Sequence, residues 1–81
     1  MNIEEVNKAI DVELRPDIRD EAKRLVSLAN TGQLIELMMY HKADKGNIFC
    51  LCLDSIKDGL VKEGKITNDD YPSFGLAFLN D

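Results

Sequence analysis

Apolar residues recur at steps of three or four along most of this chain, with polar residues between them. This spacing predicts amphipathic helices, which bury one face and expose the other. In the first segment Asn2 stands three residues before Glu5, an arrangement that resembles a capping box at a helix start. The apolar stripe that follows consists of Ile3, Val6, Ile10 and Leu14. We expect a first helix that ends near Leu14.

Pro16 opens the second predicted helix. A proline restricts the residue before it to extended geometry and suits a first helical turn, where its missing N–H needs no partner. The inner stripe of this helix consists of Ile18, Ala22, Leu25 and Ala29. Asn30, Thr31 and Gly32 then signal that one helix stops and another starts. The third helix is so apolar that it should not lie on a surface; its apolar residues are Leu34, Ile35, Leu37, Met38 and Met39.

The unbroken apolar run from Ile48 to Leu53 predicts the buried centre of the molecule. Such a short run suits a buried strand as well as a helix. We favour a helix from Asn47, as its cap, to Glu63, because helical spacing continues downstream. The residues that keep this spacing are Phe49, Cys52, Leu53, Ile56 and Leu60. Gly64 stands where a left-handed C-cap is expected.

The tail is the least regular segment of the chain. Thr67 could cap a last helix that runs through Phe74 and Phe78, but Pro72 and Gly75 both weaken it, so we expect a short, irregular helix. With 81 residues and 44% apolar content, the chain has room for one domain, spanning 1–81. The sequence therefore predicts an all-α fold, a compact bundle of four to five short helices.

The net charge of −5 restricts the expected partners. It disfavours nonspecific attraction to nucleic acid or to an anionic membrane, and it suits a basic protein partner. The segment from Met1 to Glu5 lacks the basic flank and apolar stretch of a signal peptide, and no apolar run approaches the roughly 18 residues of a membrane span. Cys50 and Cys52 are too close in sequence for a useful disulfide, so we expect free thiols in the cytoplasm.

A metal site would have to combine Cys50 and Cys52 with His41, and Asp44 could add an oxygen ligand. On a helix, residues two apart point about 200° apart, so the two thiols could not share one ion. His41 is the sole histidine that could activate a thiol, and burial would leave that thiol inert. The five glycines form no phosphate-binding loop. We expect no metal, no cofactor and no catalytic residue.

Two alternatives belong to other functional classes. The stretch from Asp54 to Asp70 resembles a segment of small phage Holliday-junction resolvases, in which a helix ends in a glycine turn followed by acidic residues. The resemblance covers less than a quarter of the chain, and the Asp-Asn pairing before that helix is absent. It implies a metal-dependent nuclease that uses Asp69, Asp70 and a carboxylate such as Asp54.

The other alternative is nucleic-acid binding by a basic face on the second helix. This face consists of Arg15, Arg19, Lys23 and Arg24. Because Asp17, Asp20 and Glu21 interleave with these cations, a solvated face is the favoured interpretation and nucleic acid an unlikely partner.

The remaining signal is a surplus of large apolar residues, which a small domain can bury only in part. The core would take up most of them, but at least one of Met39 and Tyr40 should be exposed. The candidate partner-binding residues are Met38, Met39, Tyr40, Tyr71, Phe74 and Phe78. The function we expect is non-enzymatic: a small interaction or regulatory protein that binds and inhibits or modulates a protein partner, with a homodimer as one form. Small acidic helical proteins of phages and mobile elements often act in this way.

Overall fold

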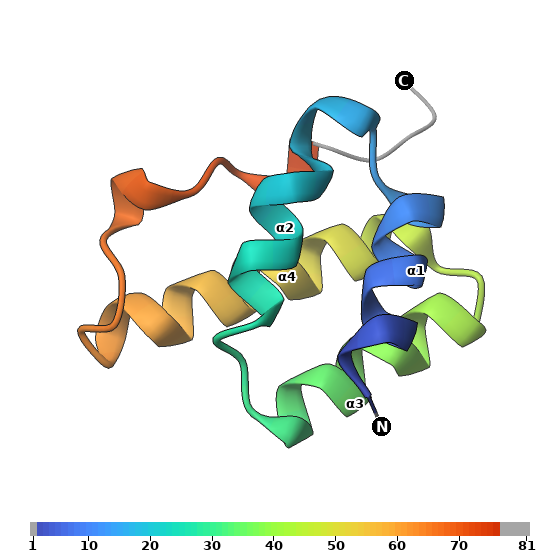
Figure 1. The fold of residues 1–81 in the computed structure, drawn as a ribbon, viewed down its shortest axis with the longest axis horizontal. Coiled ribbons are helices and arrows are strands. Elements are labelled where there is room, and N and C mark those ends of the chain that lie inside the picture. The colour runs from blue at the N-terminus through green and yellow to red at the C-terminus, as the bar shows by residue number, and fades with distance from the viewer. Residues whose placement is uncertain (1, 77–81) are drawn as a thin grey trace.

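Within residues 2–76, the part of the chain that the computed structural model describes, four α-helices are joined by short connections (Figure 1). The helices are α1 (Ile3–Glu13), α2 (Arg19–Val26), α3 (Thr31–Lys42) and α4 (Gly46–Lys62), and the 3-10 turns are η1 (Pro16–Ile18), η2 (Asn68–Asp70) and η3 (Phe74–Leu76). None of the described residues is in a strand. The predicted all-α bundle of four to five short helices is confirmed, and residues 48–53 are helical.

The starts of α1 and α3 and the end of α1 follow local signals in the sequence. The Asn2 side chain accepts a 3.1 Å hydrogen bond from the backbone N–H of Glu5, so it caps α1 as expected. Leu14 and Arg15, which precede Pro16, are both extended, with ψ of 153° and 148°, so the first helix does not continue into the proline. Asn30 caps α3, because its Oδ1 accepts from the Gln33 N–H at 2.9 Å and its own N–H donates to Gln33 Oε1 at 2.9 Å.

The turn between α3 and α4 differs from the expectation. Asp44 adopts a left-handed φ of 58°, and the Lys45 N–H donates to the Tyr40 carbonyl at 3.0 Å, as in a Schellman motif. This tight reversal lets α4 begin at Gly46 with Lys45 as its cap residue. The prediction that Asn47 caps this helix is wrong. Its side chain lies within the first turn and accepts from the Ile48 N–H at 3.0 Å.

The end of α4 was predicted correctly. Gly64 has a φ of 75°, which L-residues with a side chain adopt at a cost. Its N–H donates to the Val61 carbonyl at 3.0 Å, and the Lys65 N–H donates to the Leu60 carbonyl at 3.0 Å. These are the two hydrogen bonds of a Schellman motif, and they turn the chain out of the helix toward the tail.

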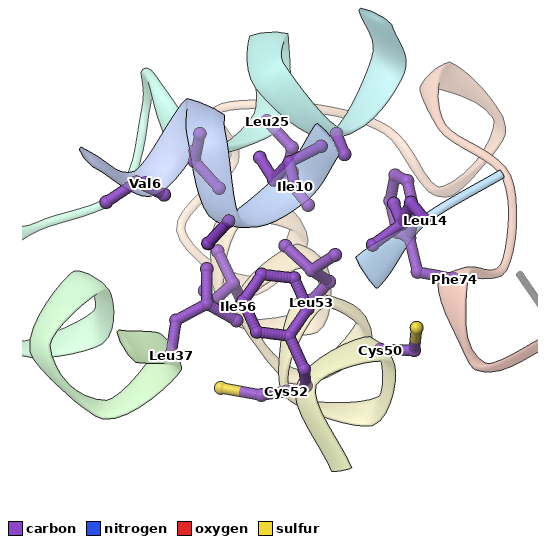
Figure 2. Packing of buried hydrophobic residues seen from close by; sticks show 14 of the residues in the cluster. Val6, Ile10, Leu14, Leu25, Leu37, Cys50, Cys52, Leu53, Ile56 and Phe74 are labelled. Atoms are coloured by element: carbon purple, nitrogen blue, oxygen red, sulfur yellow. The ribbon is translucent and has the colours of Figure 1, made fainter. Parts of the chain in front are cut away.

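The core is built around α4, which contacts α1, α2, α3 and the 3-10 turns η2 and η3 (Figure 2). Leu53 at its centre is fully buried. The other buried residues of this helix include Phe49, Cys50, Cys52, Ile56 and Leu60, and α1 and α2 contribute Val6, Ile10, Ala22 and Leu25. The prediction that 48–53 is buried is therefore confirmed for Phe49, Cys50, Cys52 and Leu53, whereas Ile48 is half-buried and Leu51 is exposed.

In place of the single irregular helix that was expected, the tail forms the two 3-10 turns η2 and η3. Asp70 accepts a 2.8 Å hydrogen bond from the Thr67 N–H, which closes the first of these turns. Pro72 lies between the turns, where its missing N–H prevents one continuous helix. Phe78 lies outside the described residues.

Candidate functional site

The outer face of α3 carries two exposed apolar side chains, Ile35 and Met39. Ile35 is 46% exposed and Met39 is 60% exposed, and residues four apart on a helix are surface neighbours. Leu37, on the opposite side of the helix, is buried, and so is Met38, which lies between the two sides. The expectation that this helix is too apolar to lie on a surface is therefore wrong. One face is in the core and the other is open.

Two side-chain contacts of His41, on the inner side of α3, fix the rotation of this helix. His41 Nδ1 lies 2.6 Å from Glu13 Oε2 on α1, and the Glu13 side chain is only 12% exposed. The His41 ring also meets Phe49 of α4 edge to face, with 6.1 Å between the ring centroids. Because one side of α3 is tied to both α1 and α4, Met39 on the other side is directed into solvent.

The other predicted partner-binding residues are divided between core and surface. Met38 is 6% exposed and Phe74 is fully buried, so neither side chain is open to a partner in this structure. Tyr40 and Tyr71 are partly buried and pack against the core. The sequence interpretation did not select Ile35, Val12 and Leu51, which are 46%, 60% and 54% exposed. Helical spacing could have identified Leu51, since it lies about 200° around α4 from the buried Leu53.

The two cysteines are free and buried on different sides of α4. Figure 2 shows the Cys50 thiol on the side of Phe74 and the Cys52 thiol on the side of Leu37. Burial, with Glu13 and Asp54 nearby, raises the pKa of Cys50 to about 11. Burial, with Glu36 nearby, raises the pKa of Cys52 to about 11. Both thiols are therefore protonated at neutral pH, which makes them poor nucleophiles and poor metal ligands.

The three carboxylates of the nuclease alternative have different surroundings. Asp70 accepts from the Thr67 amide, Asp69 is exposed, and Asp54 binds backbone amides of the tail. Across residues 2–76, no three side chains among histidine, cysteine, aspartate and glutamate are grouped so that they could hold a metal ion. No pocket opens in the same region.

The basic face on α2 is occupied by intramolecular contacts. Lys23 Nζ lies 2.7 Å from Asp11 Oδ1, and Arg19 Nε donates to the Leu14 carbonyl at 2.9 Å. The Arg24 guanidinium stacks over the Tyr71 ring, 5.4 Å from its centroid. These contacts join α2 to α1 and to the tail, and Arg15 Nε lies 3.5 Å from Asp17 Oδ1.

The sequence interpretation missed the contact between the tail and two side chains of α4, Asp54 and Lys57, which we call the tail-binding site. Asp54 Oδ1 accepts from the Phe74 N–H at 2.6 Å, and Asp54 Oδ2 accepts from the Gly75 N–H at 2.7 Å. One turn further along, Lys57 Nζ donates to the carbonyls of Tyr71 at 3.2 Å and Pro72 at 3.4 Å. Asp54 and Lys57 thus bind both backbone donors and backbone acceptors of one short segment, from Tyr71 to Gly75. No sequence motif marks this pairing.

No protein-family model matches this sequence, and neither a curated protein nor a solved structure matches it closely enough to indicate a relative. Among the described helices, none combines the length and apolar composition that crossing a bilayer would require.

Proposed function

We propose that this protein is a small, non-enzymatic interaction protein that binds a protein partner through the outer face of α3 and thereby modulates or inhibits it. The observation that carries this proposal is the exposure of Ile35 and Met39, one turn apart on a helix whose other side is tied down. The free thiols are compatible with action in the cytoplasm, where disulfides are rare.

The chemistry of this face suits a protein partner. Covering one large apolar side chain contributes about 1.5–3 kcal/mol, and an unbranched methionine adapts its shape to the opposing surface. Glu36 and Lys42 flank Met39 at three residues on either side and are exposed, so they would form a polar rim. The net charge of −5 would favour encounter with a basic partner.

The test compares Met39→Glu with Val12→Glu. Both residues are 60% exposed, and they lie on different helices, so the second variant controls for the added charge. We expect both variants to melt within a few degrees of the wild type, since exposed positions tolerate substitution. Tagged proteins are incubated with lysate of the source organism, and captured proteins are quantified and then titrated in purified form.

A partner at this face binds the wild type and Val12→Glu equally and binds Met39→Glu about fivefold or more weakly. Equal binding by all three proteins would show that the partner docks elsewhere. Unfolding of Met39→Glu would show that Met39 is a structural residue. Sedimentation adds a further outcome: a wild-type dimer that Met39→Glu converts to a monomer would identify the partner as a second copy of this chain.

A further inference from the structure

The segment from Tyr71 to Gly75 is held on α4 in the manner of a bound peptide. Its polar contacts with Asp54 and Lys57 are made by two backbone amides and two backbone carbonyls, together with the Ser73 hydroxyl, which is 3.4 Å from Asp54 Oδ2. Main-chain contacts of this kind do not depend on which side chains the bound segment carries. Another peptide backbone could therefore replace them.

Two residues of the tail, Phe74 and Gly75, indicate which peptides the tail-binding site could accept. Phe74 is fully buried, and Figure 2 shows its ring on the side of the core where Leu14 and Cys50 lie. Gly75 approaches α4 so closely that a Cβ there would lie 2.9 Å from Asp54 Oδ2 and 3.1 Å from Leu51 Cδ2. The tail-binding site therefore suits an aromatic residue followed by a glycine.

The residues around the tail-binding site would allow another peptide to replace the tail. Pro72 and Ser73 are exposed, and so are the three residues of η2, so most of the connection to α4 is in solvent. Leu51 remains 54% exposed beside Gly75 and offers apolar surface beyond what the tail covers.

We propose that Asp54, Lys57 and the cavity filled by Phe74 form a peptide-binding site for a Phe-Gly segment of a partner protein, which the protein's own tail occupies as a competing ligand. The tethered tail acts at an effective concentration on the order of mM, so it suppresses weak ligands and admits only those that bind more tightly or whose binding follows tail release. This site is separate from the outer face of α3 and does not depend on the function proposed for that face.

The test uses the full chain with Phe74→Ala, which empties the cavity, and a fluorescent peptide that spans residues 67–76. By fluorescence anisotropy, we expect the variant to bind the peptide about tenfold or more tightly than the wild type does, because the wild-type tail competes. Peptides with Phe74→Ala or Gly75→Val should not bind. Adding Asp54→Asn to the protein variant should weaken binding about tenfold, since the carboxylate accepts from two amides.

A folded Phe74→Ala protein that does not bind the peptide would overturn the proposal. If circular dichroism shows that this variant is unfolded, Gly75→Val in the full chain is titrated instead, since its added carbons displace the tail while keeping Phe74. Unfolding of both variants would mean that the tail is an indispensable part of the core, and this also overturns the proposal. A wild-type dimer that Phe74→Ala makes monomeric would assign the site to tail exchange between two copies and overturn the choice of partner.

Discussion

Glu13 and His41, which are 28 residues apart in sequence, form a 2.6 Å contact between α1 and α3. The side chains are only 12% and 27% exposed, so solvent screens this contact less than it screens an ion pair on the surface. The contact joins α1 to α3 and sets which side of α3 is open to a partner.

A double-mutant cycle with Glu13→Ala and His41→Ala should give a coupling energy of about 1–2 kcal/mol in the free energy of unfolding, because each single variant leaves a partly buried polar group without its partner. The control is the exposed pair of Glu63 and Lys65, whose side chains are 3.1 Å apart. Its coupling should not exceed about 0.5 kcal/mol. Equal coupling in the two cycles, measured by urea denaturation, would contradict a structural role for the Glu13–His41 contact.

The left-handed conformation of Asp44, with a φ of 58°, is less favourable for aspartate than for glycine. Asp44→Gly should raise the free energy of unfolding by about 0.5–1 kcal/mol. The matched control is Asp58→Gly, also exposed but within α4, which should lower the free energy of unfolding by about 0.5–1 kcal/mol. Chemical denaturation measures both. A loss of stability in Asp44→Gly would show that the aspartate side chain has a stabilising contact in this turn.

The centre of α4 should be much more sensitive to truncation than its outer face. Leu53 is fully buried and Leu51 is 54% exposed, two positions away. Leu53→Ala should cost about 2–5 kcal/mol, whereas Leu51→Ala should cost less than about 1 kcal/mol. Thermal denaturation of the two variants side by side checks this. Similar melting temperatures would contradict the assigned orientation of the helix.

The thiols should make stability fall in alkaline solution. In the unfolded chain they ionise near the ordinary pKa of 9.0, whereas burial keeps the pKa of Cys50 and Cys52 at about 11 in the folded protein. Between these values the unfolded state has released protons that the folded state keeps, so a rise in pH favours unfolding. Their contribution is complete below pH 9.0 and is lost as the pH approaches about 11.

Urea denaturation between pH 8 and pH 11 measures this effect, with the Cys50→Ala and Cys52→Ala double variant as the control for other titrating groups. The wild type should lose more stability over this range than the control does. Parallel pH profiles for the two proteins would show that the thiols ionise equally in the folded and unfolded states.

Helix identity and most helix boundaries were predictable because their causes are local. Asn2 caps through an amide three residues away, Pro16 restricts its immediate neighbour, and Gly64 adopts its left-handed conformation at the end of α4. The start of α4 was predicted two residues late, because Asp44 occupies a left-handed position that is more often glycine. A turn that depends on an uncommon conformation gives little sign of itself in residue types.

By itself, therefore, the sequence determined the all-α class, the central position of the helix that contains residues 48–53 and a surplus of apolar residues on α3. The tertiary structure decided which of these residues remain exposed. Met38 and Met39 are neighbours with similar side chains, yet one is 6% and the other 60% exposed, because contacts with α1 and α4 fix the rotation of the helix. Phe74 is buried because Asp54 binds its amide across 20 residues of chain. Such burial depends on contacts between distant segments, and periodicity within one segment cannot reveal them.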